Sequence, residues 1–260
     1  MRFVANIDMQ FVEEGPHESR LRAAAGAGFD AVEFWRWESV DLPALARAAQ
    51  DHGVEIVAFV TDWSVPAAVP AERRRFVDAV RDAVDAAWAL SATRVVTTLG
   101  TAPDGWSRDD VLSGVGEALG DAALATRGSG VTLLVEPLNT RVDHPGSAIA
   151  TAADARDLLR RVDDPAVRML FDVYHSVAQG ERVADEIAAS ASFLDYVQIA
   201  DAPGRHEPST GGIDWADVAR ALAEARYDGP TGLEFFPSGT SAASLETARR
   251  TWERAAGSVR

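Results

Sequence analysis

The sequence predicts an α/β protein whose single domain, residues 1–260, folds as a (β/α)₈ TIM barrel. Short apolar runs alternate with longer, alanine-rich amphipathic runs from one end of the chain to the other. Eight such pairs in 260 residues give about 32 residues a pair, which is the spacing typical of this barrel. No linker-like or low-complexity segment interrupts the sequence. An open doubly wound sheet is the alternative, but it would usually need fewer strands or a second domain.

The eight predicted strands are short runs of β-branched or bulky apolar residues. Their hydrophobicity is nearly continuous, as expected of parallel strands that are buried on both faces. They span residues 2–6, 31–34, 55–60, 94–99, 132–136, 168–172, 196–199 and 231–235.

Predicted helices follow the strands in turn, and each has apolar residues at helical spacing. They span residues 19–27, 42–52, 71–90, 111–127, 148–162, 183–189, 215–226 and 244–255. Glycine or aspartate separates a helix from the next strand, as at Gly53. The stretches 28–34 and 227–235 resemble each other faintly, as two copies of one helix-to-strand junction would.

The residue types that the chain lacks exclude several chemistries. There is no cysteine, and all 25 basic residues are arginine, so there is no lysine. Thiol nucleophiles, disulfides, iron–sulfur clusters and structural zinc ribbons are therefore excluded. Schiff-base aldolases, internal pyridoxal-phosphate aldimines and Walker-type phosphate loops are excluded because each needs a lysine. Carboxylates, histidines, hydroxyls, arginines or a bound metal must carry any reaction.

The charge balance argues against nucleic acid as a partner. With 25 basic and 40 acidic side chains the formal net charge is −15, which repels phosphate backbones. The arginine run from Arg73 to Arg75 lies in a predicted amphipathic helix with Glu72 and Asp78, as on a solvated face. No apolar stretch reaches the roughly 20 residues that span a membrane, and Asn6 interrupts the apolar start of the chain. We therefore expect a cytoplasmic protein with no membrane partner.

Four consecutive predicted strands end at a side chain that can bind a metal. These side chains are Glu136, Asp172, Gln198 and Glu234, at spacings of 36, 26 and 36 residues. In a TIM barrel, such strand ends surround the active site. A single carboxylate there is commonly a helix cap or an arginine partner, but three on neighbouring strands repel one another unless a cation neutralises them. The pattern therefore predicts a divalent metal held by these four residues.

The donor atoms of this set are all oxygens, which favours Mg²⁺ or Mn²⁺ over zinc. Three carboxylates and a divalent ion leave the site at about −1, with positions for water or substrate oxygens. A sugar or keto acid can chelate there through adjacent carbonyl and hydroxyl groups. The sequence thus predicts a small-molecule substrate of this kind.

Three further side chains are candidates for binding that substrate. His175 lies three residues beyond Asp172 and so faces the same mouth of the barrel. Arg205 and His206 lie in the loop that leaves the seventh predicted strand. A guanidinium and an imidazole there can hold a substrate carboxylate or hydroxyl. The alternative for Arg205 is a structural ion pair with Asp201 or Glu207, two carboxylates of its own loop.

Two other histidines and two tryptophans have no assigned role at this stage. His144 can shape a turn before a helix, and His17 either lies over the mouth or simply precedes a helix. Trp35 and Trp63 follow the second and third predicted strands, where they can wall a small pocket.

The strand-end motifs are Leu-Val-Glu136-Pro-Leu-Asn, Leu-Phe-Asp172-Val-Tyr-His175, Val-Gln198-Ile-Ala-Asp-Ala-Pro-Gly-Arg205-His206-Glu-Pro and Gly-Leu-Glu234-Phe. Together they resemble the hydroxypyruvate isomerase family, one of the xylose-isomerase-like TIM barrels of sugar isomerases and epimerases. The resemblance runs along the whole chain and is most specific in its second half.

The resemblance implies a role for each residue of these motifs. Glu136 and Glu234 would be both metal ligands and the catalytic acid/base pair. Asp172 would be a further ligand, and His175 and Arg205 would contact the substrate.

The resemblance also implies a ligand role for Gln198, which stands where sugar epimerases of the superfamily usually have histidine. That glutamine favours the hydroxypyruvate branch. Two segments depart from the family pattern. Residues 59–63 read Phe-Val-Thr-Asp-Trp where family members often read His-Asn-Leu-Pro, and residues 235–237 read Phe-Phe-Pro in place of Tyr-Lys-Pro. If the missing lysine helps to bind a carboxylate, a larger or less acidic substrate is expected.

Taken together, these features predict a metal-dependent, aldose–ketose type isomerase of a small hydroxy-carbonyl compound. The type reaction is conversion of hydroxypyruvate to tartronate semialdehyde. One glutamate removes a proton from the hydroxyl-bearing carbon, giving an enediolate, and a proton returns to the adjacent carbon. Which of Glu136 and Glu234 acts first stays open.

Three alternatives stay open beside this hypothesis. One is a ketose 3-epimerase or an inosose-type dehydratase that uses the same site. Another is a DNA-repair endonuclease, which would want several metal-binding histidines and a basic surface. The third is a sugar-binding relative that has lost catalysis. The oligomeric state, a homo-oligomer included, is likewise left open.

Overall fold

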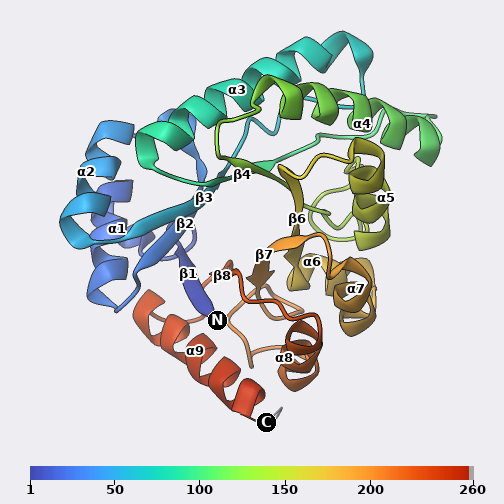
Figure 1. Cartoon of the computed structure of the whole chain (residues 1–260). Coiled ribbons are helices and arrows are strands. Elements are labelled where there is room, and N and C mark those ends of the chain that lie inside the picture. The colour runs from blue at the N-terminus through green and yellow to red at the C-terminus, as the bar shows by residue number, and fades with distance from the viewer. Residues whose placement is uncertain (258–260) are drawn as a thin grey trace.

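Eight parallel strands form the centre of the structure, a computed structural model that describes residues 1–257. They follow one another in chain order around a closed barrel, and β8 pairs with β1 to close it (Figure 1). The strands are β1 (Arg2–Asn6), β2 (Ala31–Arg36), β3 (Glu55–Val60), β4 (Arg94–Thr97), β5 (Thr132–Val135), β6 (Val167–Asp172), β7 (Leu194–Ile199) and β8 (Pro230–Leu233). The predicted TIM barrel is confirmed.

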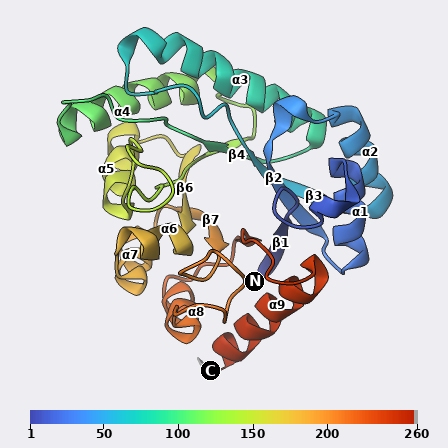
Figure 2. The same ribbon diagram turned by 180° about the vertical axis from the view of Figure 1, so that it is seen from behind.

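Helices surround the barrel, and α9 lies near the N-terminus in both views (Figures 1 and 2). The α-helices are α1 (His17–Gly26), α2 (Leu42–His52), α3 (Arg73–Leu90), α4 (Arg108–Ala125), α5 (Ala152–Val162), α6 (Val173–Gln179), α7 (Val183–Ser190), α8 (Trp215–Glu224) and α9 (Ser241–Gly257). Short 3₁₀ turns are η1 (Val12–Glu14), η2 (Trp37–Ser39) and η3 (Pro70–Glu72). Within residues 1–257 no helix is long and apolar enough to cross a membrane.

The helix and strand boundaries differ from the predicted ones, and the differences at the mouth of the barrel concern the candidate site. Glu136 and Glu234 each lie just beyond the end of their strands, and His175 lies in the first turn of α6, a helix that was not predicted. The Asp172 carboxylate caps that helix by accepting hydrogen bonds from the backbone N–H of Tyr174 (2.7 Å) and His175 (3.4 Å). Strand β6 and α6 therefore meet at a side chain that also belongs to the candidate site.

The apolar residues form two cores. The larger one lies between the strands and the surrounding helices. The smaller one has members from each of strands β1 to β7 and fills the barrel interior with Val4, Ala31, Val57, Ala58, Val60, Val96, Leu134, Leu170 and Tyr196. Side chains two positions apart on a strand share a face, so Glu136, Asp172 and Gln198 also point inward, one layer closer to the mouth.

Candidate active site

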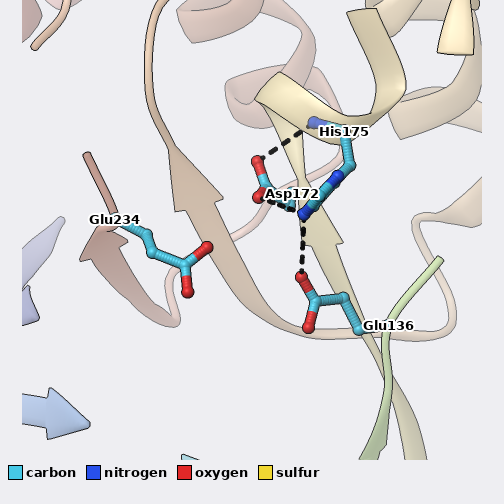
Figure 3. Close-up of side chains that lie close together, drawn as sticks. All are labelled: Glu136, Asp172, His175 and Glu234. Carbon is cyan, nitrogen blue, oxygen red and sulfur yellow. Dashed lines mark hydrogen bonds and ion pairs between the residues drawn. The ribbon is translucent and has the colours of Figure 1, made fainter. Parts of the chain in front are cut away.

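Four side chains at the mouth of the barrel converge on one space (Figure 3). Glu136, Asp172, His175 and Glu234 each offer one ligand atom, and these atoms all lie within 4.8 Å of one another. Figure 3 shows Glu234 facing Asp172 and Glu136 from the far side of this space. Strand alternation and strand order therefore bring together residues that are up to 98 positions apart in the chain.

Gln198 lies beside this group and is tied to a fourth carboxylate. It pairs with Asp172 in the register of β6 and β7. Its Nε2 donates to both carboxylate oxygens of Glu33 at 3.1 Å. Glu33 comes from β2 and is only 2% exposed.

The sequence interpretation did not identify Glu33 as a site residue. Two signals pointed to it. In the stretch Ala31-Val-Glu33-Phe-Trp35, alternation places the glutamate on the same inward face as its neighbours two positions away. The helix-to-strand stretch 28–34 also resembles the stretch 227–235, and Glu33 occupies in the first the place that Glu234 occupies in the second.

Arg205 supplies the positive charge next to these carboxylates. Its Nη2 donates to Glu234 Oε2 and lies 3.5 Å from Asp172 Oδ2. The alternative ion pair with Asp201 is not formed: that carboxylate instead accepts hydrogen bonds within its own loop and from the indole of Trp215 (3.1 Å). The attraction of Glu234 and Asp172 outweighs burial and raises the pKa of Arg205 above its usual value, so the guanidinium stays charged.

Burial and repulsion from neighbouring carboxylates make Glu136, Asp172 and Glu33 poor acids. Burial, followed by repulsion from Glu234 and Asp172, raises the pKa of Glu136 well above its usual value. Burial likewise raises the pKa of Asp172 to about 8, although Arg205 opposes the rise. Burial and then repulsion from Glu234 raise the pKa of Glu33 to about 8, against the effect of its hydrogen-bond donors. One arginine therefore does not compensate the negative charge that the site would carry if all these groups were ionised.

His175 is neutral, and its neighbours select one tautomer. Burial, then repulsion from Arg205, holds the pKa of His175 well below its usual value. Asn139 Nδ2 lies 2.6 Å from His175 Nδ1, and the amide oxygen of Asn139 is occupied by the N–H groups of Val142 and Asp143. Nδ1 is therefore the acceptor and Nε2 carries the proton. His175 Nε2 lies 3.6 Å from Asp172 Oδ2 and 3.8 Å from Glu136 Oε1. Arg205 Nη2 is nearer, at 3.4 Å, but it is itself a donor and so does not pair with a protonated Nε2.

The remaining histidines lie at different distances from the site. His144 lines the cavity, with its ring 5.3 Å from that of His175. His206, predicted to bind substrate, places Nδ1 2.7 Å from the carbonyl oxygen of Phe236 and is not among the described residues that line the cavity. His17 pairs with Asp8 at 2.8 Å.

The cluster opens into a cavity of about 520 Å³. One wall is aromatic and consists of Phe34, Trp35, Phe59 and Trp63. Both tryptophans that the sequence placed near a pocket therefore line it. Among the described residues that line the cavity, Arg205 is the only one with a permanent charge of positive sign.

The residues present fit a divalent cation. Asp172 Oδ2 and Gln198 Oε1 are buried, and no donor in the described part of the chain makes a hydrogen bond to either oxygen. A buried acceptor without a donor is costly, and a hard cation satisfies oxygen ligands of this type. A divalent cation would also compensate the excess of carboxylates over positively charged groups at the site.

The closed barrel and its carboxylate cluster define a TIM-barrel enzyme with its candidate active site at the C-terminal ends of the strands. The chain matches the family model described as "Xylose isomerase-like TIM barrel" over residues 21–256. It therefore belongs to this family, and its curated relatives place it among enzymes of the isomerase class.

Three similar proteins illustrate these relationships. A Danio rerio protein named "Putative hydroxypyruvate isomerase" is 33% identical over 272 residues, which cover 100% of this chain and 99% of that protein. The "2-oxo-tetronate isomerase" of Cupriavidus necator is 31% identical over 250 residues, covering 93% and 95%. A crystal structure described as an AP endonuclease, family 2, from Brucella melitensis has a TM-score of 0.88 at 32% identity and covers 96% of this chain and 98% of its own.

Proposed function

We propose that this protein is a metal-dependent isomerase that interconverts a hydroxy ketone and a hydroxy aldehyde through an enediolate. The observation that carries the proposal is the convergence of Glu136, Asp172 and Glu234 at one point, where Glu136 and Glu234 line the cavity and buried oxygens lack a described donor. Such a set combines groups that can move a proton with groups that can hold a cation.

The proton transfer falls to Glu136 and Glu234. They reach the cluster from the ends of β5 and β8, which β6 and β7 separate, so they approach a substrate from different directions. Because burial raises the pKa of Glu136, this carboxylate is a stronger base than an ordinary glutamate, as proton abstraction from carbon requires. One glutamate removes the proton from the hydroxyl-bearing carbon, and a proton returns to the neighbouring carbon.

The predicted ligands are Glu136, Asp172, Gln198 and Glu234, and Mg²⁺ or Mn²⁺ is the ion that their oxygens favour. When bound, a divalent cation supplies Lewis-acid polarisation of the carbonyl group and compensates the negative charge of the enediolate.

Two side chains of the cavity orient the substrate. His175 offers its Nε2 proton to a substrate oxygen, since Asn139 fixes the tautomer. Arg205 can bind a carboxylate or hydroxyl group and also forms an ion pair with Glu234. The predicted contact of His206 with substrate falls to its Nε2, because Nδ1 is paired with the carbonyl oxygen of Phe236.

Hydroxypyruvate is the first substrate to test, with tartronate semialdehyde as its product. The relatives named hydroxypyruvate isomerase and 2-oxo-tetronate isomerase support a hydroxy-keto acid of this kind. Net charge argues against a nucleic-acid substrate, despite the name of the Brucella melitensis structure: the chain carries a formal charge of −15.

A second candidate is a ketose 3-epimerase on the same site. The cavity of about 520 Å³ is larger than a three-carbon acid needs, and one wall of it is aromatic. Arg205, the cation that would bind a substrate carboxylate, is already paired with Glu234. An uncharged sugar of four to six carbons therefore fits this cavity better than a substrate that carries a carboxylate.

Proton NMR in D₂O tests the proposal. The purified protein, stripped of metal and then supplied with Mn²⁺ or Mg²⁺, is incubated with hydroxypyruvate. We expect metal-dependent deuterium incorporation together with formation of the aldehyde. Exchange into ketoses but not into hydroxypyruvate would favour the epimerase. A protein that binds metal and exchanges no proton of any hydroxy-keto acid or ketose would contradict the catalytic proposal.

A further inference from the structure

Glu33 lies at the centre of a buried hydrogen-bond network whose described members come from three strands. Tyr196 Oη donates to Glu33 Oε2 at 2.8 Å, Gln198 Nε2 donates to both carboxylate oxygens at 3.1 Å, and Asn6 Nδ2 donates to Oε1 at 3.3 Å. These donors belong to β7 and β1. The ionised carboxylate therefore acts as an acceptor toward every one of them.

The network reaches across the inside of the barrel because a glycine leaves the path open. Strands β8 and β1 separate β7 from β2, and Gly232 of β8 stands beside Gln198 in the strand register. A Cβ atom at Gly232 would lie 2.6 Å from Glu33 Oε1 and 2.8 Å from Gln198 Cγ. A side chain at this position would displace the contact between the two residues.

This contact decides which end of the Gln198 amide is available. An amide group has a donor end and an acceptor end, and the two are nearly the same size. Glu33 accepts from the nitrogen end, so the oxygen end is left for another partner. Across the described residues, no donor forms a hydrogen bond to Gln198 Oε1, although this atom is buried. Only the oxygen can bind a cation.

We propose that Glu33 is a positioning residue for the metal: it holds the Gln198 amide so that Oε1, and not the NH₂ group, is presented to the cation. This inference rests on the proposed function, which gives Gln198 a ligand role. Glu33 itself binds neither metal nor substrate in this role. It acts on the metal through Gln198, as the outer hydrogen-bond partners of metal ligands do.

Mn²⁺ titrations of the full-length, metal-stripped protein, followed by electron paramagnetic resonance of free Mn²⁺ in the absence of substrate, test the role of Glu33. Glu33→Met removes every acceptor at similar length, and we expect the Mn²⁺ affinity to fall about tenfold to a hundredfold. Glu33→Gln keeps one acceptor oxygen for the amide, so a smaller loss is expected. Circular dichroism and the melting temperature of each metal-free variant show whether the fold is retained.

The same substitutions in a Gln198→Glu background separate positioning from charge. A carboxylate at position 198 has two equivalent oxygens and needs no orientation. Removing Glu33 should then leave the Mn²⁺ affinity unchanged or raise it, because two neighbouring carboxylates no longer repel. If Glu33 contributes only its negative charge, Glu33→Met and Glu33→Gln should weaken binding equally in both backgrounds.

Each outcome decides the proposal. A graded loss that disappears in the Gln198→Glu background supports positioning. Equal losses in both backgrounds, or an unchanged affinity in both Glu33 variants, overturn it while the proposed function stands. A wild-type protein that binds no Mn²⁺ overturns both.

Discussion

The indole Nε1 of Trp35 donates a hydrogen bond of 2.7 Å to Glu234 Oε1, across 199 positions of the chain. The backbone N–H of Trp35 in turn donates to Asp8 Oδ2 at 2.6 Å, and Asp8 is held by His17. Trp35 is therefore fixed at both its backbone and its ring, and Glu234 is held between this indole and Arg205. A residue expected only to wall the pocket thus also orients a candidate catalytic group.

Trp35→Phe should lower kcat/KM roughly tenfold to a hundredfold, since a hydrogen bond to a charged group contributes about 1.5–3 kcal/mol. The matched control is Trp88→Phe, because the Trp88 indole also donates a hydrogen bond, at 3.0 Å to the carbonyl of Ser129, but Trp88 does not line the cavity. Steady-state kinetics of both variants, with metal present, compare the two losses. Similar losses in both would mean that Trp35 acts only through general stability.

Glu136→Gln and Glu234→Gln should each reduce turnover by about two to four orders of magnitude, because a neutral amide cannot exchange protons with carbon. Both variants keep the side-chain shape, so the fold should persist. The measurement is single-turnover deuterium exchange at saturating Mn²⁺, which also compensates for weaker metal binding. Full activity in either variant would remove that glutamate from the acid/base pair.

Much of this site could be predicted from the sequence because barrel geometry converts strand ends into neighbours. Glu136, Asp172 and Glu234 each follow an apolar run, and parallel strands in chain order place such ends at one mouth. Glu33 was missed because it lies inside an apolar run, where alternation is harder to see than a strand end. Helix α6 has a signal that was overlooked: Asp172 at its N-cap and Gly180 at its C-cap enclose only seven residues.

The contacts that connect these residues could not be predicted in the same way. The ion pair between Arg205 and Glu234 depends on the path of a loop that lies between β7 and α8. The hydrogen bond between Asn139 and His175 depends on how two loops meet at the mouth. Strand order fixes which ends are neighbours, but side-chain packing fixes which atoms touch.

The buried carboxylates predict that the metal-free protein loses stability as the pH rises. Asp172 has a folded pKa of about 8 against an ordinary value of 3.8, so between these values the folded chain keeps a proton that the unfolded chain has lost. The stability is therefore present at low pH and is lost as the pH approaches 8. His175 has the opposite effect on the pH dependence of stability. Because its pKa is lowered in the folded chain, stability rises with pH up to the ordinary value of 6.5.

Urea unfolding of the metal-stripped protein between about pH 6.5 and 8 isolates the effect of the carboxylates. The free energy of unfolding should fall across this window, and Asp172→Asn should reduce the slope by up to about 1.4 kcal/mol per pH unit. An excess of Mn²⁺ should also make the free energy of unfolding of the wild type less dependent on pH, because the cation compensates the ionised carboxylates. Equal slopes in the metal-free wild type and Asp172→Asn would show that Asp172 ionises normally.

His175 lies within ligand distance of the carboxylate cluster, yet its hydrogen bonds predict that it does not bind the metal. Asn139 occupies Nδ1, and Nε2 carries the proton, so no lone pair faces the cluster. His175→Leu should therefore change the Mn²⁺ affinity by less than about threefold while kcat/KM falls roughly a hundredfold, as for loss of a donor to a developing oxyanion. Asp172→Asn, tested beside it, should weaken Mn²⁺ binding at least tenfold. Electron spin-echo spectra of the Mn²⁺-loaded wild type should lack coupling to an imidazole nitrogen. Such a coupling, with a matching loss of affinity in His175→Leu, would make His175 a ligand and would require its ring to turn away from Asn139.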